Sequence, residues 1–130
     1  MKVSVIIPTF NRIDLLKQCV KSLINQDFNK KDYEIIIIND GGTDGTDLFV
    51  KRLRIKSPLI RYFKKKNGGP ASARNFGIKK SKGRIIAFID DDCIANNTWV
   101  KTLDISHRTY KYVTGIGGDY ISKSKNEKWK

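Results

Sequence analysis

Short apolar runs alternate with segments of helical length along this chain. The runs VSVIIP, EIIIIN and RIIAFI are each six residues long and almost continuously apolar. Such runs are typical of strands that are buried on both faces, as in a parallel sheet. In the segments between them, apolar residues recur at helical spacing, as they do from Arg12 to Gln26. The alternation therefore predicts strands that are connected by helices.

We predict strands at residues 2–10, 33–40, 58–63, 84–89 and, broken by glycines, 112–122, and helices at 12–26, 46–55, 70–83 and 96–111. Right-handed crossovers between such strands give a parallel sheet. The predicted fold class is α/β, a Rossmann-like and mostly parallel sheet with helices on both faces. The length of 130 residues fits one domain, residues 1–130. The run at 58–63 is the less apolar one, which places it near an edge of the sheet.

Neither end of the chain carries a signal peptide, and no apolar run approaches the roughly 20 residues that a membrane span needs. Cys19 and Cys93 have no metal-ligand spacing and are predicted to be free thiols in a reducing cytoplasm. The net charge of +13 fits attraction to nucleic acid, to an anionic membrane surface or to a phosphorylated small molecule. No nucleic-acid-binding motif organises the basic residues, so no nucleic acid partner is expected. Peripheral contact with the inner face of a membrane stays open.

Polar residues follow three of the predicted strands at their carboxyl ends. In open α/β sheets, ligands bind beyond these ends, at the point where the strand order reverses. If the strand order is 3-2-1-4, residues 8–12, 40–42 and 90–92 converge on one crevice. The sequence therefore predicts a ligand site at this edge of the sheet.

Two phosphate-binding motifs are missing from the sequence. The first strand is not followed by G-x-G-x-x-G, and G-x-x-x-x-G-K-[ST] does not occur. The glycine pair in NDGGTDGT is equally consistent with an ordinary turn. Recognition of a nucleotide by these glycine motifs is therefore not expected.

Three consecutive carboxylates, Asp90, Asp91 and Asp92, follow the predicted strand at 84–89. Clustered aspartates are hard oxygen ligands that suit Mg²⁺ or Mn²⁺, with diphosphate oxygens completing the coordination. A cation there would also offset the repulsion among the three charges. The alternative, a helix cap and turn cluster, is less favoured for three aspartates in sequence.

Asp40 ends the neighbouring strand. A carboxylate in this place can accept a hydrogen bond from a ring N–H, which uracil N3 and guanine N1 offer and adenine does not. An Asx turn that begins DGGT is an equally good interpretation of Asp40 by itself.

The segments VSVIIPTFNR, EIIIINDGGTDGT, GGPASARNFGI and IIAFIDDDC resemble the four successive motifs of family 2 glycosyltransferases. These are nucleotide-sugar-dependent enzymes with a GT-A fold. The resemblance runs from Val3 to about Trp99, with the motifs in the same order and at the same spacing. It implies the N-terminal half of a GT-A fold. It also implies transfer of a hexosyl group from a nucleoside-diphosphate sugar, with a UDP-sugar favoured, to a saccharide or lipid-linked acceptor hydroxyl, with Mn²⁺ or Mg²⁺ as cofactor.

The resemblance also implies roles for single residues. The implied nucleotide-binding residues are Pro8, Thr9, Phe10, Arg12, Asp40, Arg74, Asn75, Asp90 and Asp91. Asp40 would contact the base and Asp91 would lie near the ribose. Asp90 to Asp92 would form the DXD-like motif, with Asp92 and Asp90 as metal ligands. Asn39 is a departure, because the family often has an acidic residue there.

No catalytic base is assigned. An inverting transferase needs one, and the resemblance places it in a C-terminal half that also binds the acceptor. The chain is expected to be truncated before that half, and the edge left open is expected to favour self-association. Of the later residues, Asp104 and His107 are predicted to lie at the surface, while Asp119 and Glu127 match no family motif.

Two other functions stay open. A nucleotidyltransferase-like enzyme would share the sheet and the acidic ligands, but PTFNR stands where its glycine- and Arg/Lys-rich loop would be expected. A non-catalytic module that binds nucleotides or other anions is the second alternative. The expected location is the cytoplasm.

Overall fold

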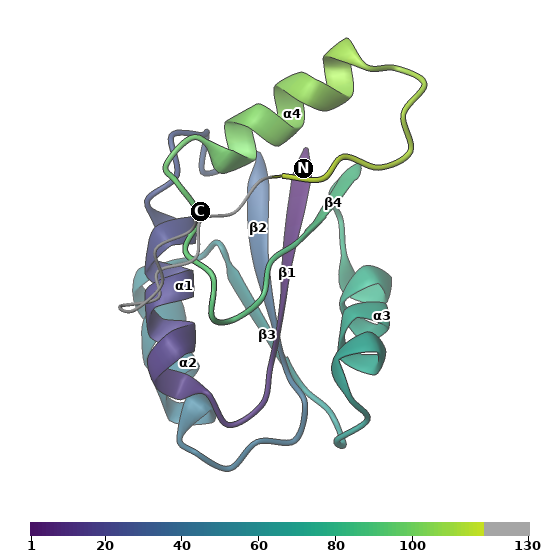
Figure 1. The fold of residues 1–130 in the computed structure, drawn as a ribbon. Helices are drawn as coiled ribbons and strands as arrows, with labels where there is room; N and C mark the ends of the chain where they lie inside the picture. The colour runs from purple at the N-terminus through teal and green to yellow at the C-terminus, as the bar shows by residue number, and fades with distance from the viewer. Residues whose placement is uncertain (119–130) are drawn as a thin grey trace, which may run out of the picture.

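The computed structural model describes residues 1–118, in which helices and strands alternate (Figure 1). The elements are β1 (Val3–Thr9), α1 (Ile13–Ile24), β2 (Tyr33–Asn39), α2 (Thr46–Lys56), β3 (Ile60–Lys64), α3 (Pro70–Lys80), β4 (Ile85–Phe88) and α4 (Trp99–Thr109). All neighbouring strands are parallel, and their order is β3-β2-β1-β4. The predicted fold class and strand order are both confirmed.

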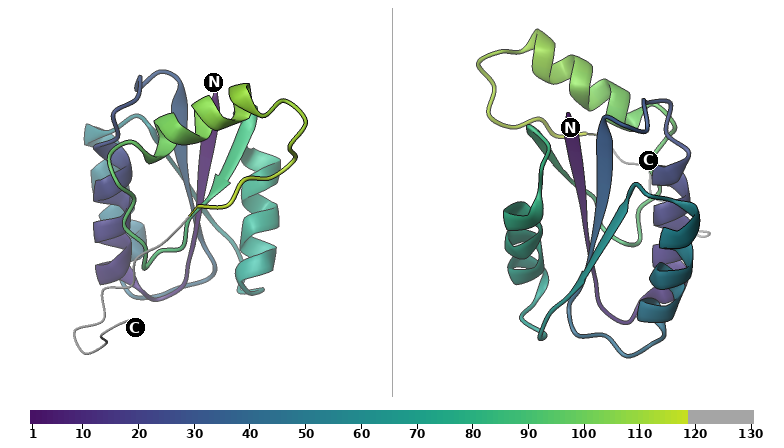
Figure 2. Two further views of the ribbon diagram at one scale, coloured as in Figure 1. Left: turned by 45° about the horizontal axis from the view of Figure 1, so that its top comes forward. Right: turned by 180° about the vertical axis from the view of Figure 1, so that it is seen from behind.

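Helices cover both faces of this sheet. Figure 1 shows α1 and α2 on one face and α3 on the other, and the view from behind in Figure 2 agrees. Val5, Ile7 and Ile35 pack in the core under α1 and α2, whereas Ile6 and Ile36 face α3. Because successive side chains of a strand point to opposite faces, covering both faces buries every residue of β2. This burial is the reason that the central strands read as continuous apolar runs.

Close packing holds α3 against β1. A Cβ atom added at Gly77 would lie 2.6 Å from Cγ2 of Ile6, so only glycine allows this approach. Beyond the end of α3, Glu34 on β2 accepts hydrogen bonds from the Ser4 hydroxyl at 2.6 Å and from the Lys82 backbone N–H at 2.8 Å. Arg61 on β3 forms an ion pair with the same carboxylate at 2.9 Å. This network joins three strands to the connection between α3 and β4.

The last helix lies across the amino ends of the strands (Figure 1), and its Val100 packs in the core with residues of α1 and the sheet. The side chain of Gln26, just after α1, binds the start of α4. It accepts a hydrogen bond from the Val100 N–H at 2.9 Å and donates one to the Asn96 carbonyl at 2.6 Å. The helix begins at Trp99, three residues after the predicted start. The Asn96 side chain accepts from the Thr98 N–H at 3.1 Å, as in an Asx turn.

Two predictions for this region are wrong: the surface position of Asp104 and a strand over residues 112–118. Asp104 is buried, with 5% of its surface exposed, because it lies one helical turn after buried Val100 on the inward face of α4. The Arg108 guanidinium neutralises it at 3.1 Å. His107 is half-buried. Residues 112–118 are exposed and form no strand; the remainder of the predicted last strand, with Asp119 and Glu127, lies outside the described residues.

Both cysteines are free, as predicted. Cys19 lies on the buried face of α1, and burial raises the pKa of its thiol to about 12. Within residues 1–118, no helix combines the length and the apolar character that crossing a membrane requires.

Candidate functional site

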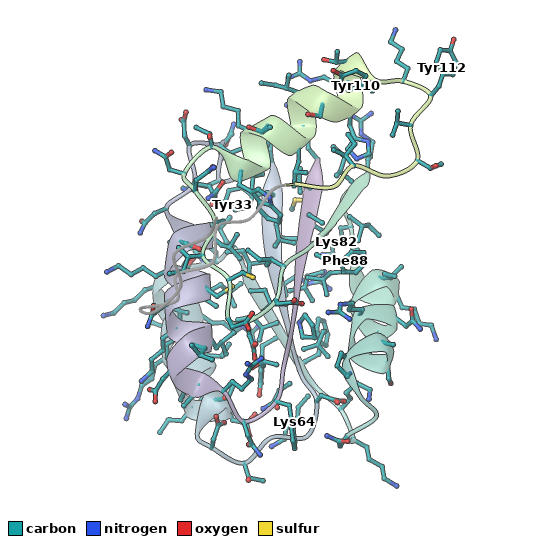
Figure 3. All side chains as sticks on the ribbon, viewed as in Figure 1. Tyr33, Lys64, Lys82, Phe88, Tyr110 and Tyr112 are labelled. Carbon is teal, nitrogen blue, oxygen red and sulfur yellow. The ribbon has the colours of Figure 1, made fainter. Side chains whose placement is uncertain are left out.

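A cleft of about 370 Å³ opens at the carboxyl ends of β1, β2 and β4. This edge of the sheet lies opposite α4: in Figure 3, Tyr33 at the start of β2 lies toward α4, and Lys64 at the end of β3 lies at the far end. The cleft is lined by Pro8, Thr9, Phe10, Arg12, Asp40, Asn67, Gly69, Pro70, Ala73, Arg74, Asp90, Asp91 and Asp92. The parallel strands therefore bring three distant segments of the sequence to one place, as the strand order predicts.

Every predicted site residue except Asn75 lines this cleft. Asn75 is exposed on α3. Consecutive residues on a helix point about 100° apart, so a helix that directs Arg74 into the cleft turns Asn75 away from it. The roles in nucleotide binding stay predictions.

Asp91 is the buried member of the acidic triplet, with 3% of its surface exposed. Its carboxylate accepts a hydrogen bond from the Thr9 hydroxyl at 2.9 Å and pairs with the Arg12 guanidinium at 2.9 Å. Burial raises the pKa of Asp91 above its ordinary value, although Thr9 and Arg12 act to lower it. Because both of its oxygens are engaged, Asp91 ties β1 to the segment after β4 and is a poor candidate for a metal ligand.

Asp90 and Asp92 are exposed, and each faces an arginine. Arg74 from α3 lies 2.8 Å from Asp90, and Arg12 lies 3.5 Å from Asp92. These two guanidinium groups offset part of the electrostatic repulsion among the three carboxylates. Ligand atoms of Asp90, Asp92 and Cys93 lie within 4.8 Å of one another and are open to solvent. A donor set with two carboxylates at an open edge fits a hard divalent ion such as Mg²⁺ or Mn²⁺.

Asp40 is buried on the opposite side of the cleft, with 4% of its surface exposed. It accepts hydrogen bonds from the backbone N–H groups of Gly68 at 3.0 Å and Gly69 at 2.8 Å, and from the Lys65 ammonium at 3.0 Å. Burial acts to raise the pKa of Asp40, but these three donors hold it below the ordinary value of 3.8. The carboxylate is therefore kept charged, and it anchors the loop that leads into α3.

The sequence analysis assigned no site role to Asn67 in this loop, NGGP. Asn67 lines the cleft and donates from its side-chain amide to the Asp40 backbone carbonyl at 3.1 Å. Gly69 adopts φ 92, which favours glycine, and Pro70 begins α3. The asparagine before two glycines was the available signal, but nothing local shows that Asp40 binds it.

The GGTDGTD turn, residues 41–47, contacts the PTFNR segment, residues 8–12, which also lines the cleft. Asn11 accepts from the Thr43 N–H at 2.7 Å, and Asp44 accepts from the Ile13 N–H at 2.9 Å. The Asn39 side chain accepts from the Gly42 N–H at 2.8 Å. Asn39, a departure from the family pattern, thus has a structural contact in this turn, which positions the PTFNR segment.

The model of the family described as Glycosyl transferase family 2 matches residues 4–129. The chain belongs to glycosyl transferase family 2. Its Rossmann-like fold also matches solved members with the GT-A fold.

Among the curated relatives, the chain is 52% identical over 91 residues to an uncharacterized glycosyltransferase of Rickettsia bellii, covering 70% of this chain and 13% of that protein. It is 34% identical over 132 residues to the poly(ribitol-phosphate) beta-glucosyltransferase of Bacillus spizizenii, covering 95% of this chain and 21% of that protein. The chain thus spans a small part of the length of these relatives.

The matching solved structures include two with bound nucleotide sugars. S. aureus TarS 1-349 in complex with UDP-GlcNAc matches with a TM-score of 0.79 and 28% identity, over 98% of this chain and 39% of that one. The mannosyltransferase PcManGT from Pyrobaculum calidifontis, in complex with GDP-Man and Mn²⁺, matches with a TM-score of 0.73 and 26% identity, over 79% of this chain and 31% of that one.

Proposed function

We propose that this chain binds the nucleoside-diphosphate-sugar donor of a metal-dependent glycosyltransferase, with a UDP-sugar as the favoured donor. The observation that carries the proposal is the cleft itself, which places charged Asp40 on one wall and the exposed carboxylates Asp90 and Asp92 on the other. Family membership and the ligands of the two solved relatives support it.

Each wall of the cleft has its own task. Asp40 Oδ2 has one donor here, the Gly69 N–H, and its second lone pair can accept a hydrogen bond from the ring N–H of uracil or guanine, which adenine lacks at this position. Pro8 and the half-exposed ring of Phe10 offer apolar surface to the base and ribose. Arg74, now paired with Asp90, can turn toward the diphosphate and form charge-assisted hydrogen bonds to it. Arg12 can add a further contact through Nη2, which now lies 3.5 Å from Asp92, while Nη1 stays with Asp91.

Asp90 and Asp92 would hold the divalent ion, which as a Lewis acid stabilises the negative charge of the departing nucleoside diphosphate. Asp91 keeps the two ligands in place through its contacts with Thr9 and Arg12. The sugar passes to the hydroxyl of a saccharide or lipid-linked acceptor. The net charge of +13 favours contact with an anionic membrane surface, and the open edge of β4 favours self-association.

A thermal-shift titration tests the donor site. UDP, GDP, dTDP and ADP are each added with and without Mn²⁺ to the wild type, to Asp92→Asn and to the control Asp27→Asn, whose exposed carboxylate lies far from the cleft. A ligand present at 100 times its Kd stabilises the folded state by about 2.7 kcal/mol. We expect a Mn²⁺-dependent rise in Tm for UDP that Asp27→Asn keeps and Asp92→Asn loses.

Two results would contradict the proposal. The donor site is wrong if none of the four nucleotides raises Tm. The assigned role of Asp40 is wrong if ADP raises Tm as much as UDP does.

A further inference from the structure

The two carboxylate oxygens of buried Asp40 are not equally free to bind a ligand. Oδ1 accepts two hydrogen bonds, from the Lys65 ammonium at 3.0 Å and from the Gly68 N–H at 3.0 Å. Oδ2 accepts one, from the Gly69 N–H at 2.8 Å. Because a carboxylate oxygen has two lone pairs, Oδ1 is filled and Oδ2 keeps one position for a ligand. Gly69, the donor to Oδ2, also lines the cleft together with Asp40.

We propose that Lys65 determines the base specificity of the donor site: by occupying Oδ1 of Asp40, it makes the site select uracil over guanine. The inference rests on the proposed function for the contact between Asp40 and the base, and it adds the residue that chooses between two bases. Lys65 acts through Asp40 and is therefore a positioning residue.

Uracil and guanine differ in the group beside the ring N–H. In uracil, N3–H lies between two carbonyl groups, so this edge offers a single donor. In guanine, N1–H lies beside the exocyclic N2 amine, so this edge offers two parallel donors, which match both oxygens of a free carboxylate. Asp40 has one free position, which satisfies the uracil edge and leaves the guanine amine without an acceptor. A polar group that loses water without gaining a partner weakens binding.

The positive charge of Lys65 acts in the same direction. The ammonium lies 3.0 Å from Oδ1 and is held there by a second hydrogen bond, to the Lys66 carbonyl at 2.6 Å. The side chain is 16% exposed, so solvent screens this charge less than that of a surface lysine. A cation beside Oδ1 attracts a uracil carbonyl oxygen and repels the N–H bonds of an amine.

The neighbouring lysines differ from Lys65 in their contacts. Lys64 is exposed and forms an ion pair with Asp47 at 2.7 Å. Lys66 is exposed and accepts from Lys65 through its backbone carbonyl, which a change of the Lys66 side chain leaves in place. Lys66 therefore provides a control in which the same charge is removed beside the site.

Calorimetric titration of the chain with UDP, GDP and inosine diphosphate (IDP), each with Mn²⁺, tests the inference. Hypoxanthine, the base of IDP, is guanine without the N2 amine, so the ratio of the GDP and IDP affinities isolates the effect of that amine. We expect the wild type to bind UDP and to bind GDP about tenfold more weakly than IDP. Binding of GDP as tight as that of IDP, or tighter, would overturn the inference.

Variants of Lys65 test its part in this ratio. Lys65→Ala opens a position on Oδ1 for the amine, so the affinity for GDP should rise about tenfold relative to IDP. Lys65→Arg, which keeps a donor to Oδ1, and the control Lys66→Ala should both keep the wild-type ratio. If Lys65 is only structural, folded Lys65→Ala binds all three nucleotides equally more weakly with an unchanged ratio, and the inference is overturned. Circular dichroism checks folding, and the wild-type ratio decides alone if Lys65→Ala does not fold.

Failure of this inference differs from failure of the proposed function. Binding of UDP, combined with GDP binding as tight as that of IDP, contradicts the role of Lys65 and leaves the donor site supported. Binding of none of the three nucleotides contradicts the donor site, and the inference with it.

Discussion

At the scale of single residues, burial separates the three aspartates of the acidic triplet into two roles. Asp91 is inside and ties β1 to the end of β4, while Asp90 and Asp92 face the cleft. Three adjacent residues of one type thus acquire two roles, because the chain turns after β4 and only one side chain can point back to Thr9. Burial is the largest cause of the raised pKa of Asp91, and the charges of Asp92 and Asp90 add to it.

Replacement of Asp91 tests its structural role. Asp91→Ala leaves the Thr9 hydroxyl and Arg12 without their acceptor, so we expect the free energy of unfolding to fall by about 1–3 kcal/mol in urea denaturation. Asp91→Asn keeps the shape and one acceptor oxygen and should cost less. Asp92→Asn, at an exposed position, is the matched control and should change stability by less than about 0.5 kcal/mol. An equal fall in the free energy of unfolding for Asp91→Ala and Asp92→Asn would contradict the structural role of Asp91.

At the scale of elements, the side chain of Gln26 connects the end of α1 to the start of α4. Gln26 is buried and bonds to the Ser22 carbonyl, the Asn96 carbonyl and the Val100 N–H. The Ser22 hydroxyl accepts from the Ala95 N–H at 3.0 Å and adds a second link to the same segment. These contacts lead the chain from the carboxyl edge of the sheet back to its amino edge.

Gln26→Ala should therefore loosen the segment before α4. We expect a loss of about 1–3 kcal/mol in the free energy of unfolding and faster amide hydrogen exchange at Val100, since the buried partners of Gln26 are left unpaired. The control is Gln18→Ala, at an exposed position on α1, in which the Val100 amide should exchange at the wild-type rate. Unchanged exchange at Val100 in Gln26→Ala would contradict this role.

The contact between α3 and β1 allows a second test at this scale. A methyl group at position 77 would meet Cγ2 of Ile6, a branch at Cβ that cannot swing away without a change of χ1. Gly77→Ala should destabilise the fold by about 1–3 kcal/mol, although alanine is the better helix former. Lys79→Ala, on the exposed face of α3, should leave the free energy of unfolding close to that of the wild type when both variants are measured by urea denaturation. A stabilised Gly77→Ala would mean that helix propensity outweighs the close contact.

At the scale of the whole molecule, several carboxylates make the fold sensitive to acid. Burial acts to raise the pKa values of Glu34, Asp40 and Asp44, but their hydrogen-bond donors lower them below the ordinary values on balance. A carboxylate with a lowered folded pKa adds stability above its unfolded pKa, near 4, and this stability is lost as the pH falls through the folded value. Protonation also raises the net charge above +13, which increases self-repulsion.

We therefore expect the free energy of unfolding, measured by urea denaturation between about pH 6 and pH 3, to fall as the pH is lowered below about 4. Glu34→Gln should be less stable near neutral pH and should show a smaller loss on acidification, because one of the linked groups is gone. Asp14→Asn, which removes an exposed carboxylate of α1, should keep the slope of the wild type. A slope that Glu34→Gln leaves unchanged would exclude Glu34 from the linkage.

The amino-acid sequence by itself determined the sheet and the position of the cleft. Continuous apolar runs are required of strands covered on both faces, and the carboxyl ends of neighbouring parallel strands must meet at one edge. Residues 8–12, Asp40 and residues 90–92 therefore converge whatever their side chains do. Arg74 joins them because α3 begins at the same edge.

Only the tertiary structure decided which side chains face the cleft and which face the core. Helix phase turned Asn75 outward, and the placement of α4 across the strand ends buried Asp104, although its charge favours the surface. The partnership of Asp40 with the NGGP loop likewise depends on a contact between distant segments. Local sequence patterns carry periodicity and propensity, whereas these orientations follow from packing against elements elsewhere in the chain, which no local pattern records.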